Sequence, residues 1–533
     1  MSAHRGTFRG HATGFIGPAV LLTLLLTAAC APSRDYSASG AADFSKIQAT
    51  EVFAAGYSGV SAKYIDRTSV GEIAIEGIRG LAAIDPDLSV VREDLGQGPM
   101  VTLSAAGRRL VRLPAPGDDD VDGWANLTAD ISMAARNASE DLRAADMETI
   151  YEAVFDGVLS NLDIFSRYAG AEEARFNRGK REGFGGIGIR YRIKEGIPVL
   201  TDILPQTPAE RAGLRKGDQL THADGVALKN LDRREISKKL RGPPHTRIEL
   251  TFVRPGESEP MTVTMDRAHI FPVTITKKID DGIVYLKLKS FNQDTARSLA
   301  EKLENASQTL GEDMKGLVLD LRGNPGGLLK QSVKVADLLL TQGRIISTRG
   351  RHEDSIHRYE AGGRDLAHGL PVVVLVDGKS ASAAEIVAAA LQDRDRAVVI
   401  GTSSFGKGSV QTVLRLPNDG EITLTWSRLV APSGYIFHGL GIRPVICTSG
   451  AKEAAQEVIR KALNNRSETE ATFVAWRKPG LQDEDKRARL RASCPSRRRT
   501  DDLDNQIARQ LINNPALYAR ALTITSATHE ARY

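Results

Sequence analysis

The sequence predicts a multidomain α/β protein, and two observations support this class. First, the chain has 533 residues, which is more than one compact hydrophobic core usually organises. Second, short apolar runs alternate with segments of helical apolar spacing between Ile270 and Ile446, a pattern that favours a mostly parallel sheet covered by helices. Residues 45–177 have mainly helical spacing, and short glycine-spaced strands are expected in residues 178–268.

The composition is that of an ordinary globular protein and argues against some classes of partner. Apolar residues make up 41% of the chain and charged residues 26%. The formal net charge of +5 is small for this length, so the sequence does not indicate a nucleic-acid-binding protein. No CxxC or HExxH spacing occurs, and we expect no metal site.

The N-terminus has the layout of a secretory signal. Arg5 and Arg9 precede an apolar stretch from Phe15 to Ala29. This stretch is shorter than an ordinary membrane-spanning helix. We therefore expect a signal peptide over residues 1–29 and an exported mature protein.

The end of this signal resembles a bacterial lipobox, in which a cysteine is acylated and becomes the first mature residue. The sequence Ala-Ala-Cys ends at Cys30, although Thr27 stands where the lipobox usually has leucine. Residues 30–44 are rich in Ser, Ala and Gly, which suits a tether. We expect a periplasmic protein of the bacterial cell envelope that is lipid-anchored to a membrane. The alternative is a cleaved signal with an incidental cysteine.

A glycine-rich stretch near residue 185 is a candidate peptide site. Glycines at 185, 186 and 188 allow tight turns, so that the amides around Ile187 can converge on a carboxylate. The strand that follows offers an edge that an extended peptide can join. On its own, such a loop is more often a plain turn than a ligand site. The candidate residues are Gly186, Ile187, Gly188 and Ile189.

A second glycine pair follows a buried strand in the C-terminal half of the chain. The strand is predicted from Gly316 to Leu321, and Gly326 and Gly327 come shortly after it. Two glycines in this place invite a close approach of the backbone to another strand or to a reacting carbonyl. Asp320 and Arg322 are expected to form a structural pair beneath this loop.

Ser382 is the candidate nucleophile, because it lies at a predicted strand-to-helix turn. The apolar run Val372–Val376 predicts a buried strand, and helical spacing begins at Glu385. Backbone N–H groups at the start of a helix have no partner, so the amide of Ala383 suits an oxyanion. Glu385 is one helical turn from Ser382, and we expect it to support the turn by hydrogen bonding.

Lys407 is the candidate base for this serine. A serine hydroxyl needs a base, and lysine can serve only where burial or a nearby cation lowers its pKa. Gln411 lies four residues on, so in an extended segment it shares a face with Lys407 and could hold the amine without adding negative charge. Lysines between glycines are more often phosphate contacts or exposed turns. A triad through His438 is a further alternative.

Together these motifs resemble the carboxyl-terminal processing, or tail-specific, serine proteases. SASAAEIVAAALQD at residues 380–393 and GTSSFGKGSVQ at 401–411 are similar to the active-site signature of that family. The resemblance implies that Ser382 is the nucleophile, Lys407 the base and Gln411 the residue that orients the base.

The same resemblance extends to the supporting residues. Arg322 to Gly327, with the preceding Asp-Leu, matches the DLRxNxGG element of the family, which is associated with the oxyanion hole. This implies that Gly327 or Gly326 acts with the amide of Ala383, and the choice between the two glycines stays open. Asp393 occupies the QD position that is associated with activity in relatives.

The preceding stretches resemble other parts of the same proteases. Residues 183–193 and 198–228 look like a PDZ domain, and LDIFSRYAG at 162–170 is similar to the segment that precedes it, with Ile164 in place of the usual proline. The resemblance implies a crotonase-like, mostly parallel-sheet protease core over residues 269–447. The PDZ domain is expected over residues 178–268, with helical regions on both sides.

The C-terminal region, residues 448–533, carries no catalytic motif. Arg477 to Arg499 holds nine bases against three acids, a run that is usually solvated or, on a lipid-anchored protein, could lie against anionic headgroups. A final helix is predicted from Leu503 to Leu522. Cys447 and Cys494 either form a disulfide that ties this region to the core or stay free thiols.

The sequence therefore predicts a serine-type endopeptidase with Ser–Lys catalysis and no metal or organic cofactor. Its PDZ domain would capture the C-terminal tails of proteins, and the core would cleave unfolded segments. The expected partners are such substrates and a membrane reached through the lipid anchor, with an adaptor protein as a further candidate and no nucleic acid. The alternatives are a catalytically silent PDZ-containing scaffold that binds tails and a hydrolase of non-peptide esters.

Overall fold

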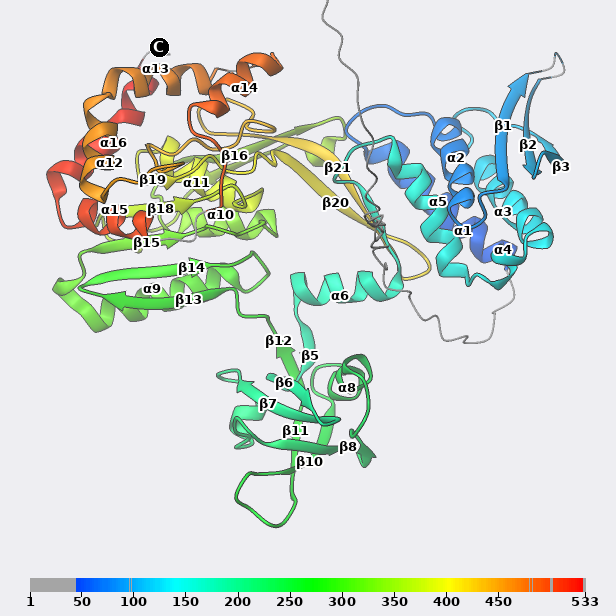
Figure 1. Cartoon of the computed structure of the whole chain (residues 1–533), viewed down its shortest axis with the longest axis horizontal. Helices are drawn as coiled ribbons and strands as arrows, with labels where there is room; N and C mark the ends of the chain where they lie inside the picture. The colour runs from blue at the N-terminus through cyan, green and yellow to red at the C-terminus, as the bar shows by residue number, and fades with distance from the viewer. Residues whose placement is uncertain are drawn as a thin grey trace, which may run out of the picture. The chain divides into compact units, whose positions relative to one another are not determined.

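The computed structural model of the chain describes residues 45–94, 96, 98–478, 480–481, 483–498 and 502–530 (Figure 1). The predicted signal peptide, the tether and the lipidation site Cys30 lie outside these residues. Within the described ranges, no helix combines the length and the hydropathy needed to cross a bilayer.

The N-terminal region is built mainly from helices, as its apolar spacing predicts. Ser69, Asp120 and Asp146 accept backbone N–H groups at three helix starts, which satisfies donors that the helices leave unpaired. The helices are α1 (Lys46–Lys63), α2 (Val70–Arg79), η1 (Gly80–Ala83), α3 (Val121–Ala138), α4 (Glu140–Ala144), α5 (Met147–Ser160) and α6 (Ala171–Glu182).

A three-stranded antiparallel sheet interrupts these helices, and the prediction of a mostly helical region did not include it. Its strands are β1 (Leu88–Asp94), β2 (Pro99–Ala105) and β3 (Arg108–Pro114), in that order. Buried and exposed residues alternate at the start of β1, where Leu88 and Val90 are buried and Ser89 is exposed. This period of two, rather than a helical period, places one face of the sheet on the helices.

The core of the N-terminal region also receives side chains from far along the chain. Leu416, Ile422 and Leu424 are buried in the same cluster as Phe53 and Phe155. Ile422 and Leu424 lie in β21 (Glu421–Val430), and Leu416 directly follows β20 (Ser409–Arg415), with which β21 forms a long hairpin. The short strand β4 (Arg167–Ala169) also pairs with β21. The segment around residue 167 is thereby fixed against a strand of the C-terminal half.

The segment with glycine-spaced strands forms a small sheet with its own apolar core. Its path runs β11-β10-β8-β7-β6, so β6 has a partner on one side only. The entering strand β5 pairs with the leaving strand β12. The elements are β5 (Phe184–Gly186), β6 (Ile189–Lys194), β7 (Ile197–Ile203), α7 (Pro208–Arg211), β8 (Gln219–Ala223), β9 (Val226–Ala227), α8 (Arg233–Leu240), β10 (Arg247–Val253), β11 (Met261–Asp266) and β12 (Ala268–Ile270).

A six-stranded sheet organises the C-terminal half. Its order is β13-β14-β15-β18-β19-β22, and the pairs from β14 onward are parallel, whereas β13 and β14 form an antiparallel pair. The strands are β13 (Ile275–Asp280), β14 (Ile283–Leu288), β15 (Gly316–Asp320), β18 (Val372–Val376), β19 (Val398–Gly401) and β22 (Ile446–Cys447).

Helices cover both faces of this sheet, which explains why β18 is apolar throughout. Val372 and Val374 pack with the cluster of α9 (Thr295–Leu310), α10 (Leu329–Asp337) and α11 (Ala383–Asp393). Val373 and Leu375 pack on the other side with the C-terminal helices. Those helices are α12 (Ala455–Asn464), α13 (Arg466–Trp476), α15 (Leu503–Ile512) and α16 (Pro515–Glu530), drawn in orange to red in Figure 1.

One feature of the C-terminal region contradicts a prediction, and a second decides between two alternatives that the sequence left open. The single helix predicted from Leu503 to Leu522 is wrong: α15 ends at Ile512, and Pro515 starts α16, because the residue before a proline disfavours helical backbone. Cys447 and Cys494 form a disulfide, with their Cα atoms 5.9 Å apart.

A second, antiparallel sheet has the order β17-β16-β21-β20. Its remaining strands are β16 (Gly343–Gly350) and β17 (His357–Ala361), with the short η3 (Glu353–Ser355) between them. Gln411, the predicted partner of Lys407, lies in β20.

Candidate active site

Ser382 lies between β18 and α11 in a strained backbone conformation. Its φ of 54° and ψ of −113° fall outside the regions that residues with a side chain usually adopt. The turn before it is held by hydrogen bonds from Ser380 Oγ to the Leu321 carbonyl and from the Ala381 amide to the Asn324 carbonyl, at 3.0 and 2.9 Å. The surrounding bonds therefore fix the half-buried Ser382 at the mouth of α11.

The carboxylate of Glu385 joins the backbones of the two principal candidates. Its Oε2 accepts the amide of Ser382 at 2.8 Å and the amide of Lys407 at 2.9 Å. Its Oε1 accepts the amide of Gly406 at 2.7 Å and the hydroxyl of Ser404. Burial raises the pKa of Glu385 to about 6, although these hydrogen bonds favour the charged form. Glu385 thus holds two segments together: the serine turn, residues 377–382, and the lysine loop, residues 402–408.

The side chain of Lys407 lies in a partly desolvated place. Its Nζ is 4.6 Å from the centre of the Phe165 ring, and among the described residues it has no hydrogen-bond or ion-pair partner, Ser382 included. Burial lowers the pKa of Lys407, and the charge of Arg167 lowers it further, while Asp163 and Glu385 act in the opposite direction. A lysine in such surroundings is closer to the neutral form that a base requires.

The segment from Asp163 to Arg167 supplies these surroundings, and the sequence analysis gave it no role at the site. Asp163 Oδ1 accepts the amides of Phe165 and Ser166 at 2.7 and 3.1 Å and the hydroxyl of Thr425 at 3.1 Å. An aspartate that accepts amides two and three residues on is a turn signal. That signal predicts the turn, but the contact with a loop 240 residues later arises only from the fold.

Gln411 has different partners from the predicted one. Its Nε2 donates to Ser409 Oγ at 2.9 Å and to Thr425 Oγ1 at 3.2 Å. The pairing of β20 with β21 shifts register between Val410 and Gln411, so the simple alternation of faces from Lys407 does not apply here. Gln411 is therefore linked to the Asp163 turn through Thr425, and its direct bond to the amine stays a prediction.

The glycine loop, residues 322–327, contacts the serine turn directly. A Cβ placed on Gly326 would lie 2.9 Å from the Cβ of Ser382 and 3.0 Å from the amide nitrogen of Ala383. Only glycine permits this approach and the φ of 102° that Gly326 adopts.

The backbone amides near Ser382 differ in whether they already have a hydrogen-bond acceptor. The amide of Gly326 donates to Asn324 Oδ1 at 2.8 Å and is occupied. Gly327 is exposed, and Ala383 is the first residue of α11; within the described ranges neither amide has an acceptor. The amides of Gly327 and Ala383 are thus available to an oxyanion.

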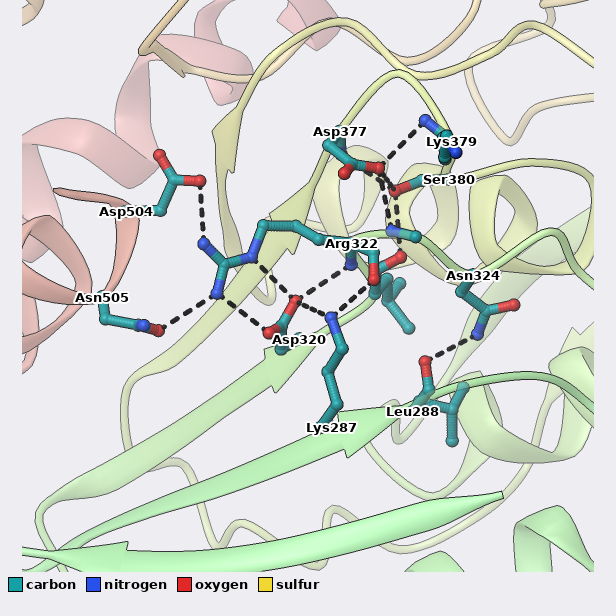
Figure 2. A network of polar contacts seen from close by, with 12 residues as sticks. Lys287, Leu288, Asp320, Arg322, Asn324, Asp377, Lys379, Ser380, Asp504 and Asn505 are labelled. Atoms are coloured by element: carbon teal, nitrogen blue, oxygen red, sulfur yellow. Dashed lines mark hydrogen bonds and ion pairs between the residues drawn. The ribbon is translucent and has the colours of Figure 1, made fainter. Parts of the chain in front are cut away.

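A charged network surrounds Arg322, the first residue of the glycine loop, as Figure 2 shows. The predicted pair of Asp320 and Arg322 is present, with 2.9 Å between Oδ2 and Nη2. Lys287 lies 3.0 Å from Asp320, and Arg322 Nη1 donates to Asp504 Oδ2 of α15 at 3.1 Å. Burial opposes the charge of Asp320, but the bonds from Arg322 and the neighbouring cations prevail and lower its pKa.

The same network reaches the serine turn through Asp377. Asp377 Oδ1 accepts the amide of Gly323, in the glycine loop, and the amide of Lys379, in the serine turn, both at 2.9 Å. Figure 2 shows this carboxylate between the two segments. Asp504, which the sequence analysis missed because it lies 122 residues after Ser382, is therefore connected to both segments of the site.

Asp393 lies at the opposite end of α11 from Ser382. An 11-residue helix is about 16 Å long, so Asp393 does not reach the reacting groups. It forms a buried ion pair with Arg477 at 2.6 Å and accepts the amide of Ser433 at 2.9 Å. Asp393 therefore fixes the position of the helix.

The basic run after α13 is not simply a solvated segment, contrary to that expectation. The side chain of Arg477 is 2% exposed, and Arg491, on α14 (Glu484–Ala492), donates to the Leu440 carbonyl at 2.7 Å. Beyond the disulfide, the Arg497 carbonyl accepts the amide of Gly378 and the hydroxyl of Thr402, both at 2.8 Å. Part of this run packs on the loops that carry Ser382 and Lys407.

The candidate peptide-binding residues form a tight loop before the edge strand β6. The carbonyls of Ile187 and Gly188 accept amides of the following segment, from Ala209 and Leu204, at 2.9 and 2.8 Å. Gly188 has a φ of 86°, and a Cβ there would lie 2.3 Å from Thr207 Cβ. Tyr191 of β6 contacts Ser237 of α8 through a hydrogen bond of 2.9 Å between their hydroxyls.

Comparison with family models identifies two parts of the chain. Residues 282–447 match the model of peptidase family S41, and residues 199–254 match a PDZ domain model. Within the described ranges, no three His, Cys, Asp or Glu side chains gather as metal ligands would.

Curated relatives extend the match. The chain is 39% identical over 303 residues to a carboxy-terminal-processing protease of Bartonella bacilliformis, covering 56% of this chain and 70% of that protein. It is 30% identical over 325 residues to a probable CtpA-like serine protease of Staphylococcus aureus, covering 60% and 64%. A solved photosystem II D1 C-terminal processing protease is 25% identical, with 58% of this chain and 87% of that one covered and a TM-score of 0.34.

Proposed function

We propose that this chain, which belongs to the family of carboxy-terminal-processing serine proteases and carries a PDZ domain, is an endopeptidase with Ser–Lys catalysis. The observation that carries the proposal is the shared carboxylate of Glu385, which binds the amides of Ser382 and Lys407 at 2.8 and 2.9 Å. These two hydrogen bonds hold the backbones of both residues at one carboxylate, which supports a reaction that needs the hydroxyl and the amine within reach of each other.

In the proposed reaction, neutral Lys407 accepts the proton of Ser382 Oγ as that oxygen bonds to the substrate carbonyl carbon. The tetrahedral intermediate collapses, the C–N bond breaks, and the Lys407 ammonium returns its proton to the leaving amine. Water then attacks the acyl-enzyme with Lys407 as base, which releases the acid and restores the serine. No metal or organic cofactor takes part in this sequence of steps.

Ala383 and Gly327 are the proposed oxyanion donors. Both amides lack an acceptor in the described part of the chain, whereas the amide of Gly326 already donates to Asn324. Gly326 instead provides the close contact with Ser382. Donors fixed before the reaction stabilise the developing charge without reorganisation.

Gln411 is proposed to orient Lys407 indirectly, through Thr425 and the Asp163 turn that carries Phe165. The bonds of Gln411 and Asp163 to the same hydroxyl support this route. Asp393 and Glu385 are proposed as supporting residues, Asp393 by fixing α11 through Arg477.

The PDZ domain is proposed to capture the C-terminal tail of an unfolded substrate. The free edge of β6 and the tight loop at Gly186 to Ile189 support an extended peptide whose carboxylate meets the loop amides. We place the domain at residues 178–268 and a crotonase-like core, supported by the parallel pairing from β14 to β22, at 269–447.

The site of action is proposed to be the bacterial cell envelope. The predicted signal peptide and the Cys30 lipobox support export to the periplasm and a lipid anchor, and the disulfide between Cys447 and Cys494 fits an oxidising compartment. A gating role for tail binding or for an adaptor protein is a further part of this proposal.

The test uses a purified disordered protein substrate with either a free or an amidated C-terminus, incubated with the wild type or with Lys407→Ala. We expect the wild type to cleave the free-tailed substrate faster, and Lys407→Ala to bind the tail with unchanged affinity without cleaving. A wild-type chain that binds the tail and never cleaves it would instead indicate the silent scaffold.

A further inference from the structure

A cavity of about 670 Å³ opens beside the candidate site. Leu328, the residue after the proposed oxyanion donor Gly327, lines it, and so does Gln411 of β20. The other walls come from α10, from β17 of the second sheet and from β21. The cavity is large enough for several residues of an extended peptide, and its position places them next to the scissile bond.

Three basic side chains line this cavity. They are Lys330 and Lys334 of α10 and His357 of β17. All three are exposed, and among the described residues none has an acidic partner. The lining contains no aspartate or glutamate. Cations left without partners in a concave site attract an anionic ligand.

Two residues of the cavity wall carry buried hydrogen-bonding groups without partners. Trp426 and Ser427 contribute to its wall, and the indole Nε1 of Trp426 and the hydroxyl of Ser427 have no partner in the described part of the chain. Ser427 is fully buried. Adjacent residues of a strand point to opposite faces of the sheet, so the two side chains do not face the cavity together, and the ligand is inferred from the charge and shape of the wall.

Apolar side chains make up much of the remaining wall. Val410, Val413 and Tyr359 line the cavity together with Leu328. A site of this kind accommodates an apolar chain that carries one or a few acceptor groups.

We propose that this cavity is a substrate subsite that selects a carboxylate in the peptide segment next to the scissile bond. The inference rests on the proposed endopeptidase function and names its substrate class: unfolded segments that carry Asp or Glu among apolar residues. Lys330 and Lys334 supply the charge, and their ammonium groups supply the hydrogen bonds. The same chemistry could come from a side chain or from the substrate's own terminal carboxylate.

The test measures kcat/KM of the full chain on matched disordered peptides. One set replaces each residue within four positions of the cleaved bond, one at a time, by Glu or by Gln. A second set repeats these peptides with an amidated C-terminus. We expect a preference for Glu over Gln of about tenfold at one position or more. If the preference survives amidation, the carboxylate is a side chain; if only the free terminus matters, it is the tail.

Charge-reversed variants then assign the preference to the cavity. In Lys330→Glu and Lys334→Glu the ratio of kcat/KM for the Glu peptide to that for the Gln peptide should fall to one or below. The matched control is Lys452→Glu, an exposed lysine that does not line the cavity, which should keep the wild-type ratio. Melting temperatures verify that all three variants fold.

Two results would overturn the inference. One is efficient, Ser382-dependent cleavage with a Glu-to-Gln ratio of one at every position. The other is a wild-type ratio in Lys330→Glu and Lys334→Glu. Absence of any cleavage by the wild type would instead contradict the proposed function, and the subsite with it.

Discussion

In the proposed reaction Lys407 acts as a base only while its amine is uncharged, so the groups around Nζ set the pH at which it can do so. The Phe165 ring lies 4.6 Å from Nζ, Arg167 adds a positive charge nearby, and Asp163 and Glu385 add negative ones. Burial and Arg167 lower the pKa of the amine, whereas the two carboxylates raise it. The protonation state of one lysine thus depends on residues from two other segments, residues 163–167 and α11.

This arrangement predicts the direction of a pH effect. Arg167→Gln removes a nearby positive charge, so the pKa of Lys407 should rise and the acidic limb of the kcat/KM profile should move to higher pH. The control is Arg175→Gln, an exposed arginine on α6. An unchanged acidic limb in Arg167→Gln, or an equal shift in the control, would argue against this role.

Glu385 is predicted to position both reacting residues. In Glu385→Gln, one amide oxygen and an NH₂ group replace an acceptor that binds four donors, so the serine turn and the lysine loop should loosen. We expect kcat to fall about a hundredfold, because small displacements of reacting groups are costly, while tail affinity stays the same. A kcat close to that of the wild type would refute the positioning role.

The raised pKa of Glu385 also predicts how stability depends on pH. Its value of about 6 in the folded protein exceeds the ordinary 4.5, so the folded state holds a proton that the unfolded state has released. The contribution of Glu385 to the free energy of unfolding therefore falls by about 2 kcal/mol as the pH rises from about 4.5 to about 6. The melting temperature of the wild type relative to Glu385→Gln should decrease over this window. A constant difference would contradict it.

Among the secondary-structure elements, α15 has the least expected role. It contributes Asp504, whose side chain is fully buried and pairs with Arg322 at the start of the glycine loop. Asp504 also accepts the hydroxyl of Thr448 at 2.7 Å. A helix of the C-terminal region is thereby connected to the loop that carries the proposed oxyanion donor.

Asp504→Asn should weaken both the fold and the reaction. Removing one partner of a buried ion pair costs on the order of 3 kcal/mol of stability, and a displaced Gly327 should lower kcat more than it changes KM. Asp485→Asn, at an exposed position on α14, is the control. Purified proteins can be compared by thermal denaturation and by steady-state kinetics; a change in KM alone would show that the loop is not the affected part.

The elements also show which features can be predicted from the sequence alone. Short-range patterns predict the strand before Ser382 and the helix after it, because apolar spacing and turn residues act locally. The sheet β1–β3 and the break at Asn514 are missed because a helical interpretation was extended across them. The bulge that separates Gln411 from Lys407, and the contacts of Phe165 and Asp504, depend on partners far along the chain.

In the whole molecule, the proposed function divides between the PDZ domain and the protease core. The domain has its own apolar cluster, around Leu220 and Phe252, so we expect the proposed tail binding to need no side chain of the core. Tail capture would raise the local concentration of substrate, and its loss should appear in KM before kcat.

Gly188→Ala tests this division. A Cβ at Gly188 meets Thr207 and the φ of 86° disfavours any side chain, so the loop should distort and tail affinity should fall about tenfold. The matched control is Gly225→Ala, which has a φ of 75° but open space around the new Cβ. Tail affinity can be measured by titration calorimetry. Equal losses in both variants would indicate general destabilisation of the domain.

The central claim is that Ser382 and Lys407 act as one unit, and a double-mutant cycle on cleavage tests it most directly. Rates of cleavage of one disordered substrate are compared for the wild type, Ser382→Ala, Lys407→Ala and the double variant. We predict that each single substitution lowers the rate by about a thousandfold or more and that the double variant is no slower than either. Substantial activity in Lys407→Ala, or additive losses in the double variant, would contradict the account.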